Sequence, residues 1–170
     1  MTNISRISCP GSPLDLATPL PSAFSLCFAG LLSALDQHIE CERDLDDVDL
    51  FDPAYQNWLD DAETAQLRLY DLASITGLAA VTPDDVPLRR MTLLIAMLVR
   101  EGSAEAFRQY GRLESSFLRH MVVPGDGLGA VRTRLMLADA REKIRAMAEL
   151  TLYRQDGDID GEACELCAAA

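Results

Sequence analysis

The stretch TPDDVPLRRMTLLIAMLVREGS, residues 82–103, contains a whole helix together with the signals for its two ends. Thr82 and Asp85 have the spacing of a capping box, in which a hydroxyl and a carboxylate satisfy the free N–H groups of a helix start. Met91–Val99 is apolar on nearly every side of a helix, which is typical of a central, buried element. The glycine and serine that close the stretch end this helix and cap the next one.

Four further helices are predicted around this central one. The spacing of apolar residues, the caps and the turn residues place them at about 22–42, 53–77, 104–121 and 128–153. Because short connectors make neighbours of successive helices, we expect an all-α fold, a single-domain antiparallel helical bundle of about five helices. The bundle domain spans residues 19–155. Residues 1–18 are expected to form an irregular N-terminal arm, and the acidic residues 156–170 a mobile C-terminal tail.

Charged side chains are segregated along the chain, whose net charge is −12. Residues 1–87 carry 15 acidic and 3 basic side chains, residues 88–155 carry 7 acidic and 12 basic ones, and residues 156–170 carry 5 acids and no base. The overall acidity argues against general binding to nucleic acid or to an anionic membrane, which needs a basic face. No stretch approaches the ~20 apolar residues of a membrane span. We therefore expect a cytoplasmic protein with neither partner.

Six of the basic residues of the second half fall into two helical stripes. Three of them share one side of the helix near 104–121, and three share one side of the last helix: Arg108, Arg112 and Arg119, then Arg134, Arg141 and Arg145. Guanidinium groups can fork onto carboxylates or phosphates, so both stripes are candidate interaction surfaces. The alternative is that they pair with acids of the same chain or simply face solvent.

A possible metal site comes from histidine and cysteine spacing. His38 and Cys41 lie one turn apart on the first predicted helix, and Cys164 and Cys167 form a CxxC pair near the C-terminus. Three thiolates and one imidazole are the ligand types of a closed tetrahedral zinc site. The two pairs are far apart in sequence, so only folding could bring them together. His38 and Cys41 could equally flank the core.

Signatures of catalysis are missing from the sequence. It contains none of the phosphate-loop patterns GxGxxG and GxxxxGK[ST], nor HExxH or GxSxG. We therefore expect no catalytic residues and favour a non-enzymatic interaction or regulatory module, acting as a homodimer or on a protein partner. The alternative hypothesis is a zinc-binding or redox-responsive protein that uses the histidine and cysteine cluster.

Overall fold

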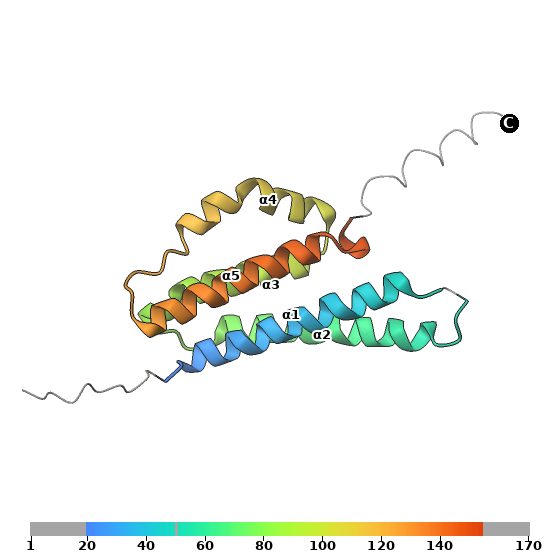
Figure 1. The fold of residues 1–170 in the computed structure, drawn as a ribbon, viewed down its shortest axis with the longest axis horizontal. Coiled ribbons are helices and arrows are strands. Elements are labelled where there is room, and N and C mark those ends of the chain that lie inside the picture. Colours follow the sequence, from blue (N-terminus) through green and yellow to red (C-terminus); the bar gives the residue numbers. More distant parts are fainter. Residues whose placement is uncertain (1–19, 50, 155–170) are drawn as a thin grey trace, which may run out of the picture.

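The computed structural model describes residues 20–49 and 51–154, and over this part of the chain it confirms the all-α fold (Figure 1). The helices are α1 (Ala23–Asp47), α2 (Tyr55–Leu78), α3 (Val86–Glu101), α4 (Ala104–Arg119) and α5 (Leu128–Ala148), with short 3₁₀ turns η1 (Pro83–Asp85) and η2 (Thr151–Tyr153). The predicted arm at 1–18 and tail at 156–170 lie outside these residues. No helix of the described part is both long and apolar enough to cross a membrane.

Four of the helices, α1, α2, α3 and α5, form a bundle in which only α2 runs opposite to the other three, and α4 lies outside it (Figure 1). α1 packs against α2 and α5, and α3 packs against the same two helices, so that the four occupy the corners of a square. α4 runs along the outside of α3 and α5 and contacts them much less. Because each helix reverses the direction of the one before it, α1, α3 and α5 all begin at the same end of the molecule.

The core consists of the apolar stripes that the sequence predicts. α1 contributes every member of its stripe: Phe24, Phe28, Leu31, Leu35 and Ile39. α3 buries one side of its helix through Leu88, Met91, Ile95 and Leu98. The expectation that α3 is buried all round is wrong, since Leu93 and Met97 are exposed on its outer side. A helix at the corner of a square bundle contacts neighbours on two sides only and leaves the rest of its surface open.

The predicted starts of α1, α3 and α4 are confirmed by hydrogen bonds, whereas α2 begins at Tyr55, two residues later than predicted, and α2 and α5 have no side-chain cap. The Ser22 hydroxyl accepts from the amide of Ser25 at 3.0 Å at the start of α1. Thr82 and Asp85 form the capping box ahead of α3, and the Ser103 hydroxyl caps α4. Gly102 ends α3 with a φ of 56°, a left-handed conformation that glycine adopts without strain.

Two helix ends differ from the prediction. α1 continues to Asp47 instead of ending near Glu42, and partly buried Leu45 extends its apolar side. α5 ends at Ala148, short of the expected residue 153. The backbone turns extended at Leu150, so that the following 3₁₀ turn carries Tyr153 into the core. Burial of the Leu150 and Tyr153 side chains therefore outweighs continuation of α5.

Candidate functional site

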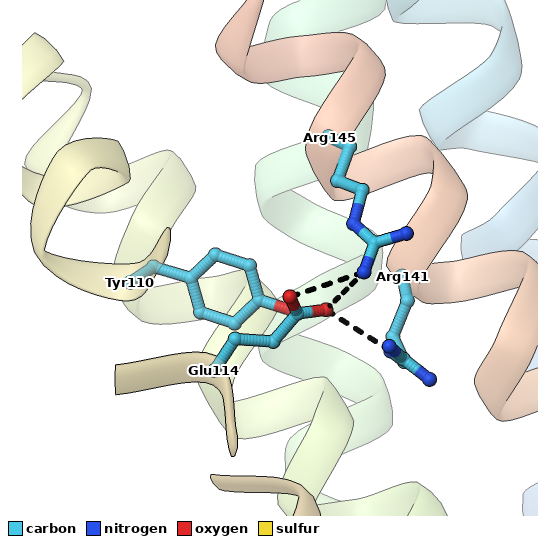
Figure 2. A network of polar contacts seen from close by, with 4 residues as sticks. All are labelled: Tyr110, Glu114, Arg141 and Arg145. Atoms are coloured by element: carbon cyan, nitrogen blue, oxygen red, sulfur yellow. Dashed lines mark hydrogen bonds and ion pairs between the residues drawn. The ribbon is translucent and has the colours of Figure 1, made fainter. Parts of the chain in front are cut away.

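Two arginines of the α5 stripe converge on a single carboxylate of the neighbouring helix (Figure 2). Glu114 of α4 accepts from Nε of Arg141 at 3.1 Å, and both of its oxygens accept from Nη2 of Arg145, at 2.8 and 3.0 Å. The Tyr110 hydroxyl lies 3.5 Å from the same carboxylate. We call these four residues the Glu114 cluster. It ties the middle of α4 to α5.

The electrostatics of this cluster favour the ionised carboxylate. Partial burial alone would raise the pKa of Glu114, but hydrogen bonds and charge from Arg145 and Arg141 outweigh it and lower the pKa. For Tyr110, burial and then the nearby negative charge of Glu114 raise the pKa to about 12. At neutral pH Tyr110 is therefore neutral and Glu114 is charged. These protonation states are typical of a structural ion pair and not of a reactive centre.

The other predicted arginines also find partners nearby, with one exception. Arg108 and Arg112 both approach Glu105, at 3.0 and 3.7 Å. Arg134 lies 3.7 Å from the carboxylate of Asp126. Arg119 is exposed and has no ion pair within the described residues. Pairing with acids of the same chain thus accounts for much of both stripes. Contact of the stripes with a partner protein stays a prediction.

His38, the first of the predicted metal ligands, is fully buried and lies against Tyr153, close to the end of the described residues. Its Nε2 lies 3.0 Å from the hydroxyl of Tyr153, and its Nδ1 lies 3.8 Å from the carboxylate of Glu42. Burial lowers the pKa of His38 to about 4 and raises that of Tyr153 to about 12. Both groups are neutral at pH 7, and the imidazole tautomer decides which of them donates in the hydrogen bond between Nε2 and the hydroxyl.

The structure places only half of the predicted zinc site. Cys41 is partly buried and lies about one helical turn after His38 on α1. Cys164 and Cys167 lie outside the described residues. Burial, followed by the negative charge of Asp61 and of further acids on α1, raises the pKa of the Cys41 thiol. Such surroundings disfavour a reactive thiolate and would favour a bound cation. No group of three His, Cys, Asp or Glu residues that could hold a metal occurs in the described ranges.

A cavity of about 530 Å³ lies at the end of the bundle where α1, α3 and α5 begin. Its walls come from the segment before α1, the start of α3, the loop between α4 and α5 and the first turn of α5. Arg90 and Arg132 line it together with several apolar side chains. A second hollow of about 480 Å³ runs between α1 and α5 and shares Pro21, Ser25 and Arg132 with the first.

Sequence reasoning missed both the Glu114 cluster and the cavity. A signal for the cluster exists, because Glu114 falls on the same side of its helix as Phe107, Tyr110 and Phe117. An acid within an apolar stripe needs a partner across the interface. The cavity has no such signal, since its walls come from three segments that are far apart in sequence.

A large apolar patch on the outer side of α2 and α3 is the last candidate. Its members are exposed although they are aliphatic or aromatic: Leu67, Tyr70 and Leu78 of α2, and Leu93 and Met97 of α3. We call these five residues the α2–α3 patch.

Comparison of the chain with protein-family models, curated proteins and solved structures finds no match in any of the three.

Proposed function

We propose that this protein is a non-enzymatic interaction module that associates with a second copy of itself through the α2–α3 patch. The observation that carries the proposal is the exposure of large apolar side chains at one place. Leu67, Leu78 and Leu93 are 68, 88 and 52 % exposed, respectively. Grouped exposed apolar side chains mark interaction surfaces in soluble proteins, whereas single ones do not.

The members of the patch lie close together because of helix spacing and the contact of α2 with α3. Leu67, Tyr70 and Leu78 fall on one side of α2, and Leu93 and Met97 lie one turn apart on α3. Between the two helices, a Cβ atom placed on Gly77 would lie 3.7 Å from Cδ2 of Leu93. This is an ordinary contact distance, so the end of α2 lies directly against Leu93 of α3 and the exposed residues of the two helices adjoin.

Charge complementarity favours a second copy as the partner. Acidic Glu63 and Asp71 lie on the exposed part of α2, and basic Arg89 and Arg100 lie on that of α3. None of these four has an ion pair within the described ranges. In a two-fold symmetric dimer the same surface is used twice, so α2 of one protomer faces α3 of the other. Acidic and basic side chains would then meet around an apolar centre.

The test is the oligomeric state of the full chain, measured by sedimentation velocity at low and high salt. We expect a dimer at low salt that weakens as salt screens the charged rim. Leu93→Asp should give a monomer with an unchanged circular dichroism spectrum. Leu135→Asp is the matched control, because Leu135 is 66 % exposed on α5, away from the patch, and it should leave the dimer intact.

Two results would contradict the proposal. If the wild-type chain is monomeric at every protein concentration in these measurements, the patch does not self-associate. A dimer that survives Leu93→Asp but is lost with Leu135→Asp would place the interface on α5. In that case the arginine stripe Arg134, Arg141 and Arg145 on the same helix becomes the predicted contact surface.

A zinc-binding or redox-responsive role is the second candidate. The observation in its favour is that Nδ1 of the buried His38 has no hydrogen-bond partner among the described residues. The proposed ligands remain His38, Cys41, Cys164 and Cys167. Elemental analysis of the purified chain should find one zinc per protein, and Cys164→Ser with Cys167→Ser should remove it. Less than stoichiometric zinc, with unchanged stability of the double variant, would exclude this role.

A further inference from the structure

We infer that the cavity at the end of the bundle binds a small amphiphilic anion, a molecule with one carboxylate or phosphate group on a short apolar chain. The inference does not depend on self-association, because the cavity and the α2–α3 patch share no residue. A cavity of about 530 Å³ is within the size range of small-molecule sites in proteins, roughly 300–1,000 Å³. Its lining decides which class of molecule it can hold.

Arg132 is the cation in the lining that is available to a ligand. It lies in the second turn of α5 and is partly buried, and the structure describes no ion pair or hydrogen bond for it. Arg90 differs, because it donates to the backbone carbonyl of His120. A partly buried guanidinium without a partner gains from an anion that can accept two of its N–H groups.

The acids in the lining do not neutralise this arginine. Asp85 is buried, and its two oxygens already accept from the hydroxyls of Ser22 and Thr82, at 2.7 and 2.6 Å. Asp84 is exposed, and no ion pair is described between it and Arg132. The Asp85 carboxylate thus serves the capping of α3, while Arg132 stays open to the cavity.

Backbone N–H groups add to the attraction for an anion at the same place. α1 is capped by a serine hydroxyl and η1 by its capping box, whereas Gly127 at the start of α5 provides no side-chain cap. Gly127, Gly129 and Ala130 all line the cavity. Their position puts the uncapped first turn of α5 beside Arg132, and the partial positive charge of a helix start favours an anionic group there.

The second hollow accounts for the apolar part of the ligand. It continues from Arg132 along the contact of α1 with α5, and its walls include Leu26, Leu32 and Met136. At its far end Asp36 and Asp139 are both paired with Lys143, which offsets one of their two negative charges and leaves Arg132 as the place for an anionic group. An anionic group at Arg132 would therefore leave room for an apolar chain in this groove.

Isothermal titration calorimetry with three probes tests the inference: octyl phosphate, octanoate and octylammonium. The Leu93→Asp chain is used alongside the wild type, so that binding of the octyl chain to the α2–α3 patch does not interfere. We expect one site for at least one of the two anions and none for octylammonium. The tighter anion identifies the head group. Arg132→Gln should weaken that anion about tenfold, the effect of losing one charged hydrogen-bonded pair.

Arg134→Gln is the matched control, because Arg134 lies on the same helix but outside both hollows, and it should bind like the wild type. Met136→Asp should weaken octyl phosphate and octanoate by placing a charge in the groove. Equal binding of octylammonium, no binding of either anion, or unchanged affinity in Arg132→Gln would each overturn the inference. Loss of binding in Leu93→Asp alone would assign the site to the α2–α3 patch instead.

Discussion

Two polar contacts hold the outlying segments of this protein to its bundle, and they differ in nearly every physical respect. The His38–Tyr153 pair fixes the turn after α5, and both groups are buried and neutral. The Glu114 cluster fixes α4, and its groups are charged and partly open to solvent. A buried neutral pair gains little from Coulomb attraction but is costly to break. An exposed ion pair is weaker and depends on salt. We therefore expect the turn to be fixed more firmly than α4.

Removal of the buried imidazole should have the largest effect. His38→Ala leaves a cavity in the core and deprives the Tyr153 hydroxyl of its hydrogen-bond partner, for an expected loss of about 4 kcal/mol in the free energy of unfolding. Urea unfolding followed by circular dichroism measures it. His38→Gln, which can place an amide oxygen near the position of Nε2, should recover part of the loss. Equal stability of the alanine and wild-type chains would mean that the contact does not hold the turn.

Acid should weaken the buried pair before it affects the exposed one. Burial lowers the pKa of His38 from 6.5 to about 4, so the unfolded chain binds a proton more readily than the folded one. Stability is then fully present above pH 6.5 and falls as the pH drops towards 4, by on the order of 3 kcal/mol. The raised pKa of Glu42 acts in the opposite direction and reduces the net loss.

The pH series should be measured as thermal midpoints for wild type and His38→Gln between pH 7 and pH 4. The wild type should lose stability more steeply, because glutamine does not titrate. Parallel curves for the two chains would contradict the assignment of the slope to His38. The Glu114 cluster should stay intact in most of this window. The lowered pKa of Glu114 means that its contribution is present above the ordinary value of 4.5 and is lost only below it.

Breaking the charged contact should release α4 with little effect on the rest. Glu114→Gln removes the carboxylate that receives Arg141 and Arg145, and about 1 kcal/mol of stability should be lost. Hydrogen exchange should show faster exchange of α4 amides, while α1 and α3 stay protected. High salt should produce a milder form of the same change in the wild type. If exchange accelerates evenly over all helices, α4 is part of the cooperative core and not an adjustable element.

The same contrast explains how much of the fold could be predicted from the sequence. Helix starts depend on residues close in sequence, such as Ser22 or Thr82 with Asp85, and these predictions are confirmed. The end of α5 depends on tertiary burial of Tyr153, which no local pattern specifies, and there the prediction is wrong. Local signals give way where packing of a large side chain decides the backbone path.

The candidate sites were less predictable for a related reason. His38 and Tyr153 are 115 residues apart in sequence, so only the folded bundle reveals that the histidine faces a tyrosine. Arg132 belonged to neither predicted arginine stripe, and the cavity that it lines is assembled from separate segments. The stripes were visible as patterns, but their partners Glu105 and Glu114 were not.

The smallest effect is expected from an arginine at the exposed edge of α4. Arg112 is 72 % exposed and lies 3.7 Å from Glu105, which already receives Arg108 at 3.0 Å. Arg112→Gln should therefore change the free energy of unfolding by less than about 0.5 kcal/mol. Exchange of α4 amides should also stay as in the wild type, in contrast to Glu114→Gln. A loss as large as that of Glu114→Gln would show that surface charge as a whole holds α4, and the special role of the Glu114 cluster would be wrong.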